Sequence, residues 1–470
     1  MIPIYTPETT QYIQSAKKAL DSGWISSHGE FIKKSEDKLK EILKTQYIIL
    51  TNNGTSSTHM LYRSLKFKYP HLTKIYVPNN VFVAVWNCAL LEYPADMIHV
   101  MQMDAKTLNM REDEEYIKSL DPFSAVIVVH NIGNVVNVPR LKRLRPDIIF
   151  VEDNCEAFME EYEGKKTGTE SLCAAVSFFG NKIITSGEGG AFYTNDKSVY
   201  EYIYKSCHHG MSYKKYIYDV PGFNYRMTNI QAALLYDQLC NIDNIIEKKK
   251  RMIFNYSKFL KPFIVSKGLW MCVLQTKNGS QLTKHLEENG VETRPMFYDI
   301  RTHEHLRTIK NIEDSCIQHD QIFMIPSSPL LEFSQQEYIS RLIIEPVIIS
   351  STPTLLDKFK KNKLPSTFRY FDKYGIENHI KTILAVDING NPIGYGHIDF
   401  DGQKHWLGVC VLPEEQRKGI GFRIVKKLLE DQKTVYLSVD KDNIVAQNLY
   451  KKFGFIQSAE TKTNYFMIRS

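Results

Sequence analysis

The sequence predicts an α/β protein with at least two domains. Strand-like and helix-like segments alternate through about residue 240, which is typical of an open, mostly parallel sheet. Beyond residue 346 the strands are joined by tight turns, which predicts a second domain with a mixed, largely antiparallel sheet. The chain has 470 residues, too many for one ordinary core, and its 43% apolar and 24% charged residues are typical of globular proteins.

The first segments end in a candidate anion site. Thr6, Pro7 and Glu8 predict the start of a helix, and Gly23 its end. Residues 47–51 form an apolar run that predicts a strand, and the sequence NGTSS follows at 53–57 before a predicted helix. Free backbone amides and hydroxyls at such a helix start suit a phosphate group.

Carboxylates follow the next informative strand. The apolar run 148–151 is followed by Glu152, Asp153 and Glu156, so these acids are expected at the end of a buried strand. A carboxylate at that place can pair with the protonated ring nitrogen of pyridoxal phosphate (PLP) and keep the ring an electron acceptor.

One lysine occupies a glycine-flanked turn between two apolar runs. Lys182 lies in the sequence SFFGNKIITSGEGG, residues 177–190, where a desolvated amine has a lowered pKa and can bind a carbonyl as a Schiff base. A single lysine in such a segment is normally a solvated surface group. The order of phosphate site, ring acid and turn lysine along the chain favours PLP chemistry instead.

The end of the first domain reads as helical. Thr228 and Gln231 predict a capping box that opens one long amphipathic helix running past Ile246. The basic run 247–251 on that helix predicts a solvated face. The net charge of +6 is dispersed, so we expect no nucleic acid binding.

Five motifs in this order resemble one family. NGTSS, VEDNCEAF, SFFGNKIITSGEGGAFYTND, GFNYRMTNIQAAL and GVETRPMFY look like the DegT-type (StrS-type) sugar nucleotide aminotransferases over residues 1–345. DSGWISS at 21–27 and GMS at 210–212 look most like the perosamine synthase branch. The resemblance implies a fold-type I PLP aminotransferase, with a large part at about 1–240 and a small α+β part at about 241–345. Its implied substrates are glutamate and a nucleotide-linked 4-keto-6-deoxyhexose.

The resemblance also implies roles for residues around the PLP ring. Lys182 would bind PLP covalently and Asp153 would pair with the pyridinium nitrogen. Glu156 would contact the ring hydroxyl, and Phe82 would stack on the ring face. Some relatives carry histidine in place of the lysine and are sugar dehydratases, so Lys182 favours transamination.

The PLP phosphate has its own implied contacts. Thr55, Ser56 and Ser177 would hold it, and Asn224 would reach the phosphate of the neighbouring subunit in a homodimer. Without the resemblance, Phe82 would be read as a packing residue and Asn224 as a turn residue. The sequence departs from the family at 99–103, and residues 251–290 are fewer than the family's small domain leads us to expect. Both departures concern the substrate-binding loops and not the cofactor residues.

A second domain is expected at 346–470. Strand-like runs at 382–386, 393–398 and 406–412 are joined by turns, and the last leads to QRKGIG at 416–421 and a helix. The small Gly419 and Gly421 let backbone amides approach a pyrophosphate. With the strand 435–439 and the sequence NIVAQNLYKKFGF at 443–455, this region resembles the GNAT acetyltransferases.

The GNAT resemblance implies acetyl-CoA as cosubstrate. Tyr450 would donate a proton to the leaving thiolate, and Asn443 would lie near the pantetheine arm. For the base, His397, Asp399 and His405 lie on or near the central strands, and a structural role is equally open for each. The pyrophosphate contacts implied are Gln416, Arg417, Lys418, Gly419 and Gly421.

Together the two halves predict a bifunctional enzyme. Amino transfer to the sugar would be followed by acetylation of the new amine. Two alternatives stay open: an acetyltransferase domain that acts on an unrelated amine, and a PLP-binding regulator without turnover. The absence of a long apolar run or a signal sequence predicts a cytoplasmic protein without a membrane partner. Eight scattered cysteines without a CxxC pair predict reduced thiols and no metal site.

Overall fold

The computed structural model describes residues 1–212, 214–372 and 374–470. They form two compact units. The first comprises Met1–Gln275 and Gly290–Glu337, and the second comprises Thr276–Asn289 and Tyr338–Ser470. The second unit therefore includes a segment from within the predicted small part of the first domain. The predicted boundary between residues 345 and 346 stays a prediction.

The first unit is built on a sheet of eight of the described strands, in the order β1-β9-β8-β5-β4-β2-β3-β12. Neighbouring strands are parallel except where β9 runs antiparallel to β1 and β8. This confirms the predicted, mostly parallel α/β sheet. The strands are β1 Tyr47–Thr51, β2 Lys74–Pro78, β3 Ile98–Met101, β4 Ser124–Val129, β5 Ile149–Asp153, β8 Ala174–Ser177, β9 Gly190–Thr194 and β12 Asn311–Ile312.

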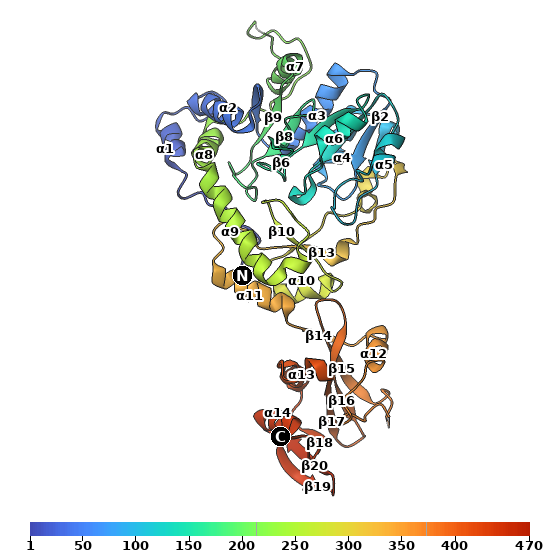
Figure 1. The fold of residues 1–470 in the computed structure, drawn as a ribbon. Coiled ribbons are helices and arrows are strands. Elements are labelled where there is room, and N and C mark those ends of the chain that lie inside the picture. Colours follow the sequence, from blue (N-terminus) through green and yellow to red (C-terminus); the bar gives the residue numbers. More distant parts are fainter. Residues whose placement is uncertain (213, 373) are drawn as a thin grey trace. The chain divides into compact units, whose positions relative to one another are not determined.

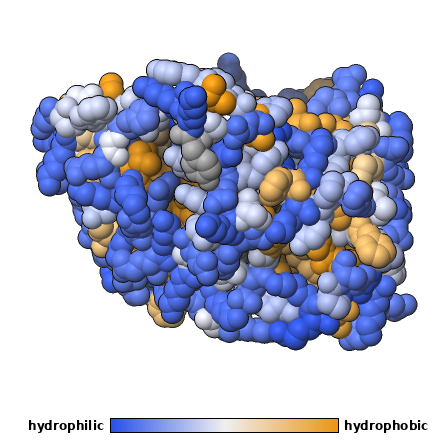
Figure 2. All heavy atoms as spheres, turned by 90° about the horizontal axis from the view of Figure 1, so that it is seen from above, coloured by the Kyte–Doolittle hydropathy of each residue, from blue (hydrophilic) through white to orange (hydrophobic). Residues whose placement is uncertain are grey.

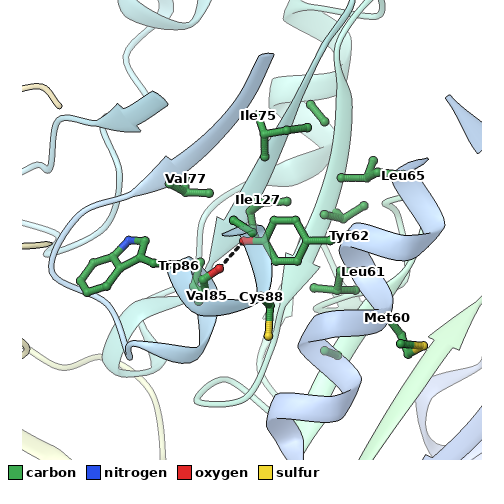
Figure 3. Close-up of a cluster of buried hydrophobic side chains, with 14 of the residues drawn as sticks. Met60, Leu61, Tyr62, Leu65, Ile75, Val77, Val85, Trp86, Cys88 and Ile127 are labelled. Atoms are coloured by element: carbon green, nitrogen blue, oxygen red, sulfur yellow. Dashed lines mark hydrogen bonds between the residues drawn. The ribbon is translucent and has the colours of Figure 1, made fainter. Parts of the chain in front are cut away.

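Helices cover both faces of this sheet (Figure 1), because its strands bury side chains on both sides. Tyr62 lies in the core on one face, where its hydroxyl donates to the carbonyl oxygen of Val85 at 2.6 Å (Figure 3). This bond satisfies the polar end of a fully buried ring. The helices on that face are α3 Gly54–Lys68, α4 Ala84–Glu92 and α7 Lys197–Cys207, and the other face carries α5 Glu114–Ser119 and α6 Val138–Leu144.

The remaining helices of the sheet domain correct two predictions. The capping box of Thr228 and Gln231 is confirmed, but its helix, α8 Asn229–Cys240, stops at Asn241. A separate helix, α9 Ile242–Leu260, follows, so the single long helix was wrong. The first helix, α1 Gln14–Asp21, also begins later than predicted, and Glu8 is instead buried in a pair with Lys248. Together with α2 Glu30–Leu43, helices α1 and α8 form a second core against β1, β8 and β9.

The basic run on α9 is not wholly solvated. Lys249 is fully buried, and its Nζ donates to the carbonyl oxygens of Trp270 at 2.7 Å and Ser327 at 2.5 Å. Burial lowers the pKa of Lys249 to about 7. The predicted solvated face is therefore wrong at this residue, since backbone carbonyl oxygens of two distant segments, rather than water, accept its hydrogen bonds.

Two small sheets complete the first unit. Strand β13 Ile322–Ile325 lies between β10 Cys272–Gln275 and β11 Arg294–Pro295, antiparallel to both. Beside this sheet, Trp270, Met271 and Val273 form one core with Ile4 and Ile132. A short hairpin pairs β6 Glu161–Tyr162 with β7 Lys165–Lys166. Helix α11 Phe333–Ile344 then passes from the first unit to the second.

The second unit contains a sheet of seven of the described strands, in the order β14-β15-β16-β17-β18-β20-β19. All pairs are antiparallel except β17 and β18, which are parallel and pair at one position, Trp406 with Tyr436. This confirms the predicted mixed, largely antiparallel sheet. Its strands are β14 Val347–Ser350, β15 His379–Val386, β16 Pro392–Phe400, β17 His405–Val411, β18 Val435–Asp440, β19 Ile456–Glu460 and β20 Asn464–Arg469.

Helices α12 and α13 pack their apolar sides on the second sheet. Ile420, Ile424 and Leu428 of α13 lie in one core with Phe359 of α12 and Tyr395 of β16. The helices of this unit are α10 Gly279–Glu288, α12 Pro353–Lys360, α13 Ile420–Leu429 and α14 Ile444–Lys452.

The surface and the thiols agree with a globular chain. Figure 2 shows a face on which hydrophilic residues predominate and hydrophobic residues form scattered patches. No helix among the described residues is long and apolar enough to cross a membrane. All eight cysteines are free, and five are buried.

Candidate active site

Lys182 lies in the loop between β8 and β9, as predicted. The loop is held by hydrogen bonds to its backbone: Tyr5 donates its hydroxyl to the Lys182 carbonyl at 2.8 Å, and Trp270 donates its indole N–H to the Asn181 carbonyl at 3.0 Å. Lys182 Nζ lies 4.1 Å from the centre of a Trp270 ring and 3.9 Å from Glu156 Oε1. The amine is therefore held between an aromatic face and a carboxyl group.

The two predicted acids lie at and just beyond the carboxyl end of β5. Asp153 is 5% exposed and accepts hydrogen bonds from Thr58 Oγ1 at 2.9 Å and from the Cys155 N–H at 3.0 Å. Glu156 is also buried and accepts from the Ile132 N–H at 2.7 Å. Burial raises the pKa of Glu156 to about 7, against the opposing effect of Lys182. The group therefore lies near the midpoint of its titration at neutral pH and can donate or accept a proton.

The predicted phosphate residues lie together where α3 begins. Asn53 caps the helix by accepting from the Ser56 N–H at 2.8 Å, and Ser56 Oγ donates to Asn52 Oδ1 at 2.7 Å. A Cβ at Gly54 would lie 2.6 Å from Ser177 Cβ. The missing side chain therefore lets the helix start approach Ser177 closely. Thr55 is exposed in the same turn.

These residues fit PLP. A buried carboxylate, an amine and a helix start that only glycine permits match the ring nitrogen, the aldehyde and the phosphate of that molecule. The pocket beside Lys182 combines the polar groups with apolar walls. Its lining consists of Cys155, Glu156, Phe158, Ser177, Lys182, Ile183, Ile184 and Trp270.

Two further predicted PLP contacts, Phe82 and Asn224, are exposed side chains. Phe82 is 54% exposed and meets Phe297 edge-on, with ring centres 6.2 Å apart. Asn224 is exposed and accepts from Arg226 Nε at 2.8 Å. Neither belongs to the lining of the Lys182 pocket, so their roles stay predictions.

Sequence reasoning missed three contacts of this site. Trp270 and Tyr5 come from segments distant in sequence, and no local pattern marks either of them. Thr58 follows the NGTSS motif by one residue, and its hydroxyl orients Asp153. A threonine one helical turn after Gly54 was the signal available, since residues four apart lie on one helix face.

The second unit has a cleft of about 1930 Å³. It opens beside the single pairing of β17 with β18, where the two strands separate. Gly419 adopts φ +79° as the N-cap of α13, and Arg417 adopts φ +64°, so the backbone turns sharply ahead of the helix. Predicted acetyl-CoA residues on the cleft wall are Gln416, Arg417, Gly419, Gly421, Asn443 and Tyr450.

Lys418 and Tyr450 contrast in placement. Lys418 is absent from the cleft lining, and its Nζ pairs with Glu415 at 3.0 Å. Tyr450 is 7% exposed, and burial raises its pKa to about 12. Its phenol is therefore protonated at neutral pH. Asn443 caps α14 by accepting from the Ala446 N–H at 3.1 Å.

Comparison with known proteins separates the same two regions. The sequence matches the DegT/DnrJ/EryC1/StrS aminotransferase family over residues 7–343 and the acetyltransferase (GNAT) family over residues 352–455. It is 32% identical over 316 residues to the GDP-perosamine synthase of Escherichia coli O157:H7, covering 64% of this chain and 86% of that protein.

Solved structures show the same fold. A Helicobacter pylori aminotransferase of pseudoaminic acid biosynthesis superposes with a TM-score of 0.66 at 20% identity, covering 72% of this chain and 97% of that one. The E. coli GDP-4-keto-6-deoxy-D-mannose-3-dehydratase gives 0.65 at 20% identity, covering 73% and 99%. The chain belongs to the DegT/DnrJ/EryC1/StrS family of PLP-dependent aminotransferases and carries a C-terminal GNAT domain, which uses acetyl-CoA.

Proposed function

We propose that the chain is a bifunctional sugar nucleotide enzyme. The first unit transfers the amino group of glutamate to the C4 ketone of a nucleotide-linked 4-keto-6-deoxyhexose. The second unit acetylates the new amine. The observation that carries the proposal is the gathering of Lys182, Glu156 and Asp153 beside the helix start at Gly54, in a chain that also has an acetyltransferase cleft. The similarity to GDP-perosamine synthase supports the sugar class.

The residues of the first unit divide the work of amino transfer. PLP supplies an electrophilic carbon and a ring that delocalises electrons. Asp153, fixed by Thr58, holds the proton on the ring nitrogen. Lys182 Nζ would bind the cofactor covalently and, once released, would remove the α proton of glutamate and later deliver a proton to C4 of the sugar. Glu156 contacts the ring hydroxyl, with a pKa of about 7 that allows it to share that proton.

The phosphate of PLP would bind where α3 begins. Thr55, Ser56 and Ser177 surround the start of α3 and supply hydroxyls and backbone N–H groups. We propose that Asn224 completes this site in a homodimer, and that Phe82 covers the ring. The exposure of both side chains in the single chain supports these roles.

The second unit binds acetyl-CoA at the N-terminus of α13. Backbone N–H groups of residues 416–421 would face the pyrophosphate, and Asn443, on the same cleft wall, would lie near the pantetheine arm. Tyr450 donates its proton to the departing thiolate, since its phenol is protonated at neutral pH. Fusion of the two units is useful when the product of the first is the acceptor of the second.

A mass-based assay tests the proposal. The purified chain is incubated with PLP, glutamate and the GDP-, UDP- and dTDP-linked 4-keto-6-deoxyhexoses, with and without acetyl-CoA. We expect one sugar to exchange its ketone for an amine and then to gain one acetyl group. Bound PLP without amination of any sugar would support the regulator. Amination without acetylation, together with acetylation of another amine, would assign the second unit to an unrelated acceptor.

A further inference from the structure

A polar cluster lies where β15 begins and β16 ends. Asp399 is the cross-strand partner of His379. Asp399 Oδ1 lies 3.2 Å from His379 Nε2, and Oδ2 lies 3.5 Å from His397 Nε2. The hydroxyl of Tyr370 donates a short hydrogen bond to Oδ2. These four residues, Tyr370, His379, His397 and Asp399, are called the Asp399 cluster below.

The rings of the Asp399 cluster are fixed by packing. The imidazoles of His379 and His397 are parallel within 1°, with centres 4.5 Å apart, and the Tyr370 ring centre lies 4.1 Å from that of His397. Gly408 faces His397 on β17, and a Cβ there would lie 2.1 Å from His397 Cε1. His379 Nδ1 lies 2.8 Å from Thr382 Oγ1. The neighbouring strands thus leave room for these rings and orient them.

The Asp399 cluster faces the cleft that holds the predicted acetyl-CoA residues. Tyr370, His397 and Asp399 line it together with Tyr450. The Asp399 side chain keeps 15% exposure. Its Oδ1 is buried and has no hydrogen-bond partner among the described residues, although His379 Nε2 lies 3.2 Å away. The carboxyl group that lines the cleft therefore keeps unused accepting capacity at its buried oxygen.

The electrostatics single out Asp399 as the proton acceptor of the cluster. Burial raises its pKa, which the hydrogen bond from Tyr370 and the proximity of His379 oppose in part. Burial and then His379 lower the pKa of His397 to about 3, so His397 is neutral at neutral pH. A carboxylate with a raised pKa is the stronger base. The other titratable groups that face the cluster are Lys360, Tyr374, Glu377, Tyr395 and Cys410.

We propose that Asp399 is the general base of acetyl transfer, with Tyr370 and His379 as positioning residues. This deepens the proposed function and rests on it. The acceptor arrives as an ammonium ion, and Asp399 takes one proton from it. The neutral nitrogen then attacks the thioester carbonyl, so that a C–N bond forms and the C–S bond breaks. Tyr450 protonates the thiolate and is reprotonated by the nitrogen, and Asp399 releases its proton to water.

The test measures acetyl transfer by the full-length chain, across pH 5.5–9.5, to the 4-amino sugar nucleotide that the mass-based assay identifies. Asp399→Asn should lower kcat at pH 7 by about 100-fold or more and leave the KM for acetyl-CoA within about twofold. The fall in the rate of the wild type at acid pH should follow the titration of Asp399. In the variant the rate should instead rise about tenfold per pH unit as the free amine forms in water.

Two further variants test whether the effect at Asp399 comes from loss of a general base or only from loss of a negative charge in the cleft. Asp401→Asn removes a carboxylate from the same cleft wall two residues away and should retain the acid limb and a rate within about twofold of the wild type. Tyr370→Phe should move the acid limb to higher pH, because the carboxylate loses a donor. Equal losses in the Asp399 and Asp401 variants, or an unchanged acid limb in Asp399→Asn, would refute the base.

Dialysis against EDTA tests the alternative that the Asp399 cluster binds a metal ion. The rate should survive dialysis. A rate lost on dialysis and restored by Zn²⁺ would make the cluster a metal site and overturn the inference. If the wild type acetylates no amine, the proposed function fails and the base fails with it. If the wild type acetylates and Asp399→Asn matches it, the base alone fails.

Discussion

Gly54→Ala probes the contact that brings the start of α3 to Ser177. The new Cβ would lie 2.6 Å from Ser177 Cβ and 2.8 Å from Ser177 Oγ. Carbon atoms in ordinary contact are about 3.5–4.0 Å apart, so the two segments must separate by about 1 Å. Ser177 ends β8 and is paired with Gly190 of β9 in the centre of the sheet. The helix start, rather than the strand, is therefore the part that moves.

The size of the effect follows from that displacement. Overpacking of this kind costs about 1–3 kcal/mol of stability. A hydrogen bond to a phosphate oxygen does not survive lengthening by about 1 Å, and one bond to a charged group contributes about 1.5–3 kcal/mol. We therefore expect PLP affinity to fall by about 10- to 100-fold.

The assay is a PLP titration followed by absorbance, with thermal unfolding measured beside it. Gly180→Ala is the matched control, because a Cβ at Gly180 in the Lys182 loop meets no atom within 4 Å. We expect the control to bind PLP as the wild type does. If Gly54→Ala binds PLP within about twofold of Gly180→Ala, the helix start does not form the phosphate site.

Three other variants test separate parts of the account. Lys182→Ala should abolish amine transfer while acetylation of a supplied 4-amino sugar nucleotide continues, if the proposed function holds, and mass spectrometry of both products checks this. Lys249→Met should remove a pH dependence: folded Lys249, with its pKa lowered to about 7, binds fewer protons than the unfolded chain, so wild-type stability rises from pH 7 toward pH 10 by up to about 1.4 kcal/mol per unit. Denaturant unfolding at pH 7.5 and 9 should show that rise in the wild type alone, and equal slopes would count against it. Thr228→Ala should cost about 1 kcal/mol through loss of the capping box, whereas Thr228→Ser should keep most of it; urea unfolding compares them.

Local patterns predicted what local physics determines. The strand at 47–51, the capping box at Thr228 and the three hairpin strands of the second unit each follow from a few consecutive residues. The position of Lys182 between β8 and β9 also followed from its glycines and the flanking apolar runs. These signals depend on backbone propensity and on burial of one face, which a short window of sequence contains.

Long-range contacts decided the places where prediction failed. Lys249 resembles any lysine on a polar helix face, and only the carbonyls of Trp270 and Ser327 explain its burial. Glu8, predicted in the first turn of a helix, instead pairs with Lys248, which is 240 residues away in the sequence. In the second unit, Tyr370 and His379 escaped notice because their meeting with Asp399 is made by strand register and a distant loop.

The segment Thr276–Asn289 has a consequence for how the two activities can be studied. It carries α10, which packs with β14 in the second unit, yet the chain on both sides of it belongs to the first. The backbone therefore crosses between the units three times, at 275/276, 289/290 and 337/338. Cutting the gene at residue 346 would leave α10 on one fragment and its partner β14 on the other, and would expose the apolar side of α10. Dissection by point substitution, silencing one reaction at a time in the intact polypeptide, avoids that damage.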